Sequence, residues 1–282
     1  MPARTRRNPS PNAPARPQYA PMHRLSLPLL ALLASLPTLA QDNAPPPRTL
    51  RVLTYNIHHG EGLDQKLDLP RIAAIIRAAE PDLVALQEVD VNTRRTGGVD
   101  QAAELARLTG LHAYFAKAMD YQGGQYGQAI LSKHPLTDTK THPLPPAEPG
   151  VEPRIVAEAR ITIGGQTLAF LATHLDHQNE PRRLKQVAEI ARITAGLKDT
   201  PAFLAGDFNA TPTSAPIAIV TEQWADATAG ETMLTSPAEK PRRKIDYIFH
   251  RPKARLRVVE SKVLDEPVAS DHRPVLSVFE LR

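Results

Sequence analysis

Asp207 and Asn209 follow directly after an apolar run, residues 201–205, that has the length of a buried strand. Two positions apart on an extended chain, both side chains would point to the same side. A carboxylate and a carboxamide at this spacing can hold a water molecule, a metal ion or a phosphate oxygen. Asp and Asn also form tight turns, so the pair alone predicts a reactive site or an Asx turn equally well.

Similar polar residues stand at the ends of other apolar segments. They are Asn56, His58, Glu88, His174, Asp246, Asp271 and His272. Each has a plain alternative, because a Glu can simply end a strand at the surface and a lone His is more often structural than catalytic. Together, these carboxylates, imidazoles and carboxamides suit metal-assisted hydrolysis of a phosphate ester, with histidines exchanging protons near neutral pH. The set therefore predicts one hydrolytic site.

Strands and helices must carry these side chains to one place. Helices are expected over residues 69–80 (after the N-cap Asp68), 100–109, 181–197 and 214–224. Strands are expected over residues 49–56, 83–86, 111–118, 126–132, 154–163, 166–175, 201–205, 244–249, 258–264 and 275–281. Gly164-Gly165 permits a hairpin turn between two of these strands. Residues 89–99 and the proline-rich residues 135–153 are expected to be loops.

The chain contains no cysteine, which excludes disulfides and thiolate ligands. Any metal must then be held by oxygen or imidazole ligands, and such ligands favour Mg²⁺, Mn²⁺ or Ca²⁺ over structural zinc. Residues 49–282 suit a single α/β catalytic domain with a substantial core.

Residues 1–40 have the pattern of a signal peptide. They contain five arginines and no acidic residue, and their apolar run, residues 25–39, is too short to span a bilayer. An uncleaved anchor helix is the alternative, against which Pro28 and Pro37 argue. Cleavage after Ala40 would export the protein to the periplasm or the medium without a membrane anchor, and residues 41–48 would form a proline-rich linker. Met22 is an alternative start, which would make residues 1–21 spurious.

Removing this leader changes the charge balance. The whole chain has 34 basic and 30 acidic residues, and taking away the five leader arginines leaves 29 basic residues against the same 30 acidic ones. The exported chain is therefore close to neutral. The basic balance of the whole chain does not indicate nucleic-acid binding.

The motifs, in this order, resemble the endonuclease/exonuclease/phosphatase family, which includes pancreatic-type deoxyribonucleases, abasic-site endonucleases, sphingomyelinases and inositol phosphatases. The resemblance covers nearly all of residues 49–282. Its segments are Thr54–Asn56, Leu86–Asp90, Tyr126-Gly127, Thr173–Leu175, Gly206–Asn209, Ile245–Ile248 and Ser270–His272. It implies an α/β fold, a four-layered α/β/β/α sandwich of two packed mixed sheets flanked by helices, with the site at one edge between the sheets.

The resemblance also implies which residues bind metal and activate water. The ligands of a divalent cation, Mg²⁺ or Mn²⁺ with Ca²⁺ as an alternative, would be Glu88, Asp271 and Asn56. His272, oriented by Asp246, and Asp207 would position or deprotonate the attacking water. The division of the base role between Asp207 and His272 stays open.

Other residues are expected to contact the substrate. By the same resemblance, His174 would protonate or stabilise the leaving oxygen, Asn209 would hold a phosphate oxygen, and Tyr126 would contact the phosphate. Further expected substrate-binding residues are Arg94, Arg95, Gln128 and His58. Gln128 stands where many members of the family have Asn.

The sequence thus predicts an exported, divalent-metal-dependent phosphoesterase that hydrolyses a phosphodiester or a phosphomonoester with an activated water. An exported non-specific nuclease is one alternative, although a near-neutral chain with 5% aromatic residues does not suggest a basic, stacking surface. A catalytically inactive binding module is another, against which the complete polar set argues. The substrate can be a small molecule, a lipid headgroup or a nucleic acid, and a monomer is expected.

Overall fold

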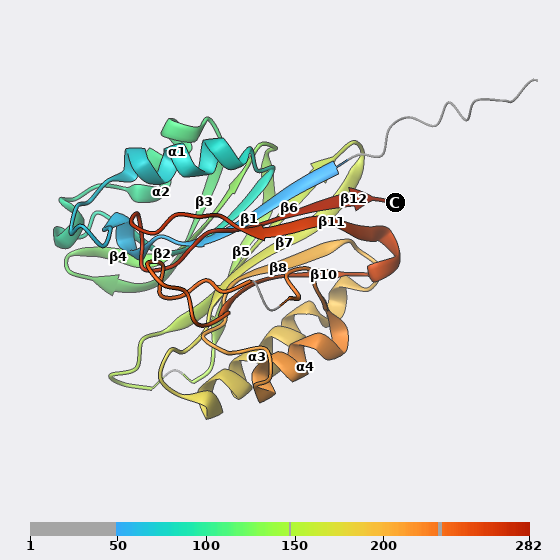
Figure 1. The fold of residues 1–282 in the computed structure, drawn as a ribbon. Helices are drawn as coiled ribbons and strands as arrows, with labels where there is room; N and C mark the ends of the chain where they lie inside the picture. The colour runs from blue at the N-terminus through green and yellow to red at the C-terminus, as the bar shows by residue number, and fades with distance from the viewer. Residues whose placement is uncertain (1–48, 147, 231–232) are drawn as a thin grey trace, which may run out of the picture. The chain divides into compact units, whose positions relative to one another are not determined.

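Two six-stranded sheets pack against each other, and helices cover their outer faces (Figure 1). The computed structural model describes residues 49–146, 148–230 and 233–282. The expected signal peptide and linker, residues 1–48, lie outside these ranges. Helices α1 and α2 lie on one side of the paired sheets and α3 and α4 on the other. The predicted α/β/β/α sandwich of two mixed sheets is therefore confirmed.

The first sheet has the strand order β11 (Leu256–Val263), β12 (Val275–Leu281), β1 (Thr49–Asn56), β2 (Leu83–Val91), β4 (Gly124–Ser132), β3 (His112–Tyr121). The second has the order β5 (Leu136–Leu144), β6 (Arg154–Ile163), β7 (Gln166–His174), β8 (Ala202–Asp207), β10 (Asp246–Arg251), β9 (Ala225–Asp226). The α-helices are α1 (Leu69–Ala79), α2 (Gln101–Thr109), α3 (Glu180–Thr194) and α4 (Ala215–Gln223), and short 3₁₀ turns are η1 (His58–Gly60), η2 (Arg94–Thr96), η3 (Ala195–Leu197) and η4 (Lys253–Arg255). Within the described ranges, no helix has the length and apolar character needed to cross a membrane.

Alternation along the strands sends neighbouring side chains into different layers. In β2, Leu83 and Ala85 join the core between the sheets, whereas Val84 and Leu86 pack with the buried faces of α1 and α2. Side chains of β7 and β8 alternate likewise between the core that lies between the sheets and the layer that packs against α3 and α4. Because the central strands are buried on both faces, they are continuous apolar runs in the sequence.

The predicted helix starts are confirmed. The Asp68 side chain accepts a hydrogen bond from the Arg71 backbone N–H, and the Asp100 side chain accepts one from Ala103. The hairpin about Gly164-Gly165 is confirmed as well, since β6 pairs antiparallel with β7.

Two segments expected to be loops contain strands. Residues 136–144 form β5, which pairs with β6 at the edge of the second sheet. Most of its side chains are exposed, so no alternating apolar pattern marks it in the sequence. β2 likewise continues to Val91, because a shift in its pairing with β4 between Leu86 and Val89 accommodates Glu88.

Candidate active site

A cavity of about 660 Å³ lies at one edge of the sandwich, and residues of both sheets line it. The predicted site residues that line it are Glu88, Arg95, Tyr126, His174, Asp207, Asn209, Asp271 and His272. Asn56 and Asp246 lie directly behind this lining, hydrogen-bonded to Glu88 and to His272. The structure therefore brings most of the predicted residues together.

The strand directions explain this meeting. β1 is parallel to β2 and β7 to β8, so the residues that end these strands share an edge. β10 is antiparallel to β8 and places its first residue, Asp246, beside Asp207. Arg154, the first residue of β6, reaches the cavity in the same way. Reasoning from strand ends misses Arg154; the signal that could have identified it is a charged residue opening a predicted antiparallel strand.

Other residues line the cavity without having been predicted as site residues. They include Tyr121, Glu152, His177, Ser236 and Arg243. Most of these belong to turns and loops, whose packing no periodic pattern encodes.

The Asp207 carboxylate forms an Asx turn and faces the cavity at the same time. Its Oδ1 accepts a hydrogen bond from the Asn209 backbone N–H at 2.8 Å, and its Oδ2 accepts one from Asn56 Nδ2 at 3.3 Å. Asn209 has a left-handed φ of 48° and reaches the cavity from beyond the end of β8. Burial, reinforced by Asp246, raises the pKa of Asp207 to about 7.

Gly206 permits the close approach of β7 and β8 that delivers Asp207. Its φ is 152°, and a β-carbon at this position would lie 1.9 Å from the Thr173 carbonyl oxygen. A side chain here would therefore push the two strands apart.

His272 lies between two carboxylates. Its Nδ1 is 2.9 Å from Asp246 Oδ2, and its Nε2 is 3.7 Å from Asp207 Oδ2. The Thr235 hydroxyl also donates to Asp246 Oδ2, at 2.5 Å. Burial favours the neutral imidazole, but Asp246 and Asp207 outweigh burial and raise the pKa of His272 to about 10. The imidazole is therefore a cation at neutral pH.

His174 is neutral, although it is close to the same carboxylate as the cationic His272. Its Nε2 lies 3.5 Å from Asp207 Oδ2. Burial, followed by the charges of Arg154 and His272, lowers the pKa of His174 well below its usual value. A neutral imidazole can donate one hydrogen bond without carrying a charge.

Glu88 projects from the irregular part of β2, where its φ is 58°. Its Oε1 accepts a hydrogen bond from Asn56 Nδ2 at 3.0 Å. Burial raises the pKa of Glu88; the Asn56 hydrogen bond opposes this shift and Asp271 reinforces it. Within the described ranges, no lysine or arginine forms an ion pair with Glu88 or Asp271. Two uncompensated carboxylates and a carboxamide fit a divalent cation with oxygen ligands.

Ser270 fixes the loop that carries Asp271 and His272. Its hydroxyl donates to the Asn56 backbone carbonyl at 2.7 Å, and the His272 backbone N–H lies 3.3 Å from the same hydroxyl. The end of β1 and this loop are thus tied together, although they are more than 200 residues apart in the chain.

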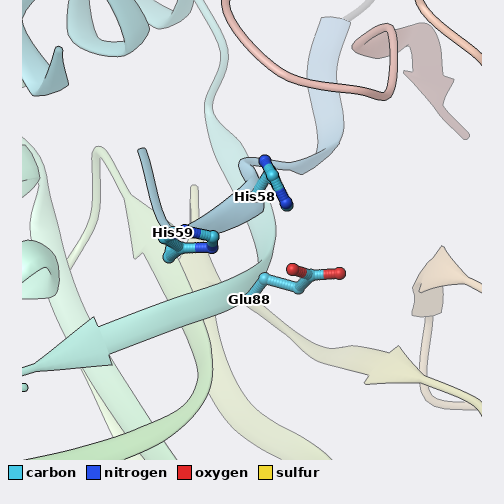
Figure 2. Close-up of side chains that lie close together, drawn as sticks. All are labelled: His58, His59 and Glu88. Carbon is cyan, nitrogen blue, oxygen red and sulfur yellow. The ribbon is translucent and has the colours of Figure 1, made fainter. Parts of the chain in front are cut away.

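The turn after β1 brings two imidazoles next to Glu88, as Figure 2 shows. His58 and His59 each place a ring nitrogen so that these two atoms and one Glu88 carboxylate oxygen all lie within 4.8 Å of one another. His58, an expected substrate-binding residue, is not among the residues that line the cavity. His59 was not predicted, although two adjacent histidines before a glycine are a visible signal. Burial, followed by Arg95, lowers the pKa of His59 to about 4.

Arg94 and Arg95 have different surroundings. Arg95 makes two hydrogen bonds to the buried Asp90 carboxylate, at 2.6 and 2.8 Å, and its guanidinium lies over the rings of Tyr121 and Tyr126. It lines the cavity, whereas Arg94 is exposed and lies outside the lining. Adjacent residues of the 3₁₀ turn η2 thus point in different directions, and the contact of Arg94 with the substrate stays a prediction.

Gln128 does not reach the cavity either. Its Nε2 donates to the Ile155 backbone carbonyl at 3.1 Å, so the carboxamide links β4 to β6 between the two sheets. This contact is structural, and the expected contact of Gln128 with the substrate stays a prediction.

Solved structures share this fold. An endonuclease/exonuclease/phosphatase from Beutenbergia cavernae is 27% identical over 83% of this chain and 72% of that one, with a TM-score of 0.67. The mannosyl-6-phosphatase of Bacteroides thetaiotaomicron is 19% identical over 82% and 99%, with a TM-score of 0.67. The human nocturnin catalytic domain is 21% identical over 83% and 95%, with a TM-score of 0.65. The last two establish likeness of fold alone. A comparison with curated protein sequences finds no match.

The sequence itself matches a family. The model of the Endonuclease/Exonuclease/phosphatase family matches residues 53–272, from within β1 to His272. This range contains every polar residue that the strand ends bring to the cavity. The paired sheets and the order of the motifs agree with the match. The chain therefore belongs to the Endonuclease/Exonuclease/phosphatase family, whose members are phosphoric ester hydrolases.

Proposed function

We propose that the chain is an exported, divalent-metal-dependent enzyme that hydrolyses a phosphodiester or a phosphomonoester with an activated water. One observation carries the proposal: Asp207, a cationic His272 and Glu88, which has no ion-pair partner among the described residues, face a single cavity. A carboxylate can accept a proton from water, and a cation can stabilise the charge on phosphoryl oxygens. An unpaired carboxylate can hold a metal ion.

In this proposal Asp207 positions the attacking water and accepts its proton. Oδ1 is already bonded to the Asn209 backbone, so the proton goes to Oδ2. His272 is held as a cation between Asp246 and Asp207, and its Nε2–H is directed away from Asp246 toward Asp207 and the cavity. This arrangement favours Asp207 as the base and His272 as a charged hydrogen-bond donor to the phosphoryl group.

His174, Asn209 and Tyr126 would contact the other phosphate oxygens. His174 is neutral, so it stabilises the leaving oxygen by a hydrogen bond rather than by giving it a proton. Asn209 donates one N–H of its side-chain amide to the Leu175 backbone carbonyl at 3.1 Å, and its second N–H can donate to a phosphate oxygen. Burial raises the pKa of Tyr126 well above its usual value, so its hydroxyl stays a donor.

Glu88, Asp271 and Asn56 would hold the divalent cation, Mg²⁺ or Mn²⁺, with Ca²⁺ also compatible with oxygen ligands. When bound, such a cation neutralises charge on the phosphoryl oxygens and polarises the phosphorus. The unpaired charge of Glu88 beside Asp271 supports this assignment.

The charges around the cavity favour a small phosphate ester over a nucleic acid. Two of the three lining arginines already have acidic partners: Arg95 pairs with Asp90, and Arg154 Nη1 lies 2.9 Å from Glu152, whereas Arg243 donates to the Ser236 hydroxyl. A polyanion needs a surplus of positive charge, which paired arginines do not supply. A structural neighbour described as a mannosyl-6-phosphatase is consistent with a small substrate. The basic, acid-free leader supports export followed by its removal.

Hydrolysis of four substrates would test the proposal: plasmid DNA, a phosphocholine lipid, a bis-aryl phosphodiester and an aryl monophosphate. We expect activity on at least one small ester that is lost with EDTA and restored by Mg²⁺ or Mn²⁺. Hydrolysis that EDTA leaves unchanged, or none on any ester, would contradict the proposal. N-terminal sequencing of exported protein should begin near Gln41, and a start at Met1 or Met22 would contradict the cleavage.

A further inference from the structure

Two adjacent histidines next to Glu88 have no part in the proposed reaction. His58 and His59 form the turn η1 after β1, and both have left-handed backbones, with φ of 45° and 44°. Non-glycine residues rarely adopt this conformation. Both rings lie next to Glu88, which extends from β2 (Figure 2).

Among the residues that the structure describes, His58 uses only one of its two ring nitrogens in a hydrogen bond. Its Nδ1 lies 3.0 Å from the Glu61 backbone carbonyl oxygen. A carbonyl oxygen only accepts hydrogen bonds, so Nδ1 carries the proton and Nε2 carries the lone pair. A histidine that binds a metal commonly donates its other ring N–H to a carbonyl in this way.

His59 has a buried nitrogen that lacks a partner. The residue is 8% exposed, and within the described ranges its Nδ1 has no hydrogen-bond partner. The His59 backbone carbonyl accepts a hydrogen bond from Gln101 Nε2 at 2.6 Å, which holds the turn against α2. A buried, unpartnered imidazole nitrogen needs a proton donor or a metal ion to offset the loss of water.

The separations fit a single ion after a small closure. One ligand atom each from His58, His59 and Glu88 lies within 4.8 Å of the others. Ligands at about 2.0–2.1 Å from one ion lie ~3–4 Å apart, so an inward movement of about 1 Å suffices. Two imidazoles and a carboxylate on one side of an ion are ligands that first-row transition metals prefer and Mg²⁺ does not.

We propose that His58, His59 and Glu88 form a binding site for a divalent transition-metal ion, distinct in ligand chemistry from the oxygen-ligand cation of the proposed reaction. The site rests on the proposed function only in sharing the Glu88 carboxylate. The remaining coordination positions are left to water or to a substrate oxygen. The consequence is a metal preference: the site retains Co²⁺ or Zn²⁺ in the presence of excess Mg²⁺.

Co²⁺ titration of the untagged full chain tests the site. Visible absorption and equilibrium dialysis, both in a large excess of Mg²⁺, should show one bound Co²⁺ per chain. His58→Gln and His59→Gln should each weaken this binding by about tenfold or more, because each removes a ligand. His112→Gln, an exposed histidine at the start of β3, is the matched control and should bind Co²⁺ as the unchanged chain does.

A second measurement needs no variant and so does not depend on whether the variants fold. In the NMR spectrum of the unchanged chain, Co²⁺ should produce a hyperfine-shifted, solvent-exchangeable imidazole N–H signal from His58. Absence of that signal, or Co²⁺ affinity unchanged in both folded histidine variants, would overturn the site and leave the two imidazoles as packing groups. Neither readout involves hydrolysis, so this inference and the proposed phosphoesterase activity can fail separately.

Discussion

The two acidic groups at the cavity differ in how their charge is compensated. In the Asp207 group, defined by Asp207, Asp246 and His272, a protonated imidazole lies between the two carboxylates. In the Glu88 group, defined by Glu88, Asp271 and Asn56, Glu88 accepts a hydrogen bond from the neutral Asn56 amide, and neither carboxylate has a lysine or arginine partner within the described ranges.

The difference separates two tasks. The Asp207 group contains its own cation, because His272 is hydrogen-bonded to Asp246 and lies beside Asp207. The Glu88 group keeps uncompensated negative charge, which a cation can remove. In both groups acidic side chains lie close together, but the Asp207 group contains a cation, His272, and the Glu88 group contains none.

The largest expected effect tests the Asp207 group as one unit. His272→Ala should lower kcat by about a thousandfold or more, roughly 4 kcal/mol, because the charged donor to the phosphoryl group is lost. Asp246 acts through His272, so the double variant His272→Ala with Asp246→Asn should have a kcat scarcely lower than that of His272→Ala alone. Measuring kcat and melting temperature for both single variants and the double variant separates the possibilities. Rate losses that add would mean that Asp246 works independently.

The Glu88 group should respond to metal instead. Glu88→Gln should weaken Mg²⁺ binding by about a hundredfold, or ~2.7 kcal/mol, measured by calorimetry. In the unchanged chain, saturating Mg²⁺ should raise the melting temperature by about 5 °C or more, and in Glu88→Gln this rise should vanish. Asp207→Asn is the comparison variant and should keep most of the metal-dependent rise. A similar loss in both variants would show that the two groups are not separate.

A histidine outside both groups, His250, shows what burial does where the nearby carboxylate, Asp226, does not outweigh it. Burial, with Lys253 adding to it, lowers the pKa of His250 to about 4. The folded chain therefore binds this proton more weakly than the unfolded chain, whose histidines titrate near 6.5. The stability from burying a neutral His250 is complete above pH ~6.5 and is lost as the pH falls toward about 4, amounting to at most ~3.4 kcal/mol.

His250→Leu should flatten the pH dependence of the free energy of unfolding between those values. Denaturant unfolding at several pH values measures it, with the exposed His112→Gln as control. Parallel curves for His250→Leu and the unchanged chain would exclude His250 as the cause.

The smallest expected effect concerns two carboxylates on one strand, Glu88 without an ion pair and Asp90 paired with Arg95. Arg95→Ala should raise KM on the natural substrate by about tenfold, ~1.4 kcal/mol, because its guanidinium lies at the cavity. Arg94→Ala is the matched control and should leave KM unchanged, since Arg94 is exposed and outside the lining. Equal effects of the two substitutions on KM would contradict this difference between Arg94 and Arg95 in substrate binding.

The sequence by itself determined the features that depend on residues close together in the chain. Asp68 and Asp100 begin helices because each side chain bonds a backbone N–H three residues later. The buried strands are apolar runs, and the order of the polar strand ends indicates the family and most of the residues at the cavity. Edge strand β5 was not predicted, because its side chains are exposed on both faces and the sequence therefore lacks an alternating apolar pattern.

Only the tertiary structure decided which polar groups meet and in what charge state. Arg95 pairs with Asp90 while its neighbour Arg94 does not, Gln128 bonds across the sheets, and Arg154 enters the cavity from the start of an antiparallel strand. His272 is cationic and His174 neutral, although both lie beside Asp207. Each charge state is set by burial and by carboxylates and arginines brought close from distant strands, and such sums over long-range contacts have no local signature in a sequence.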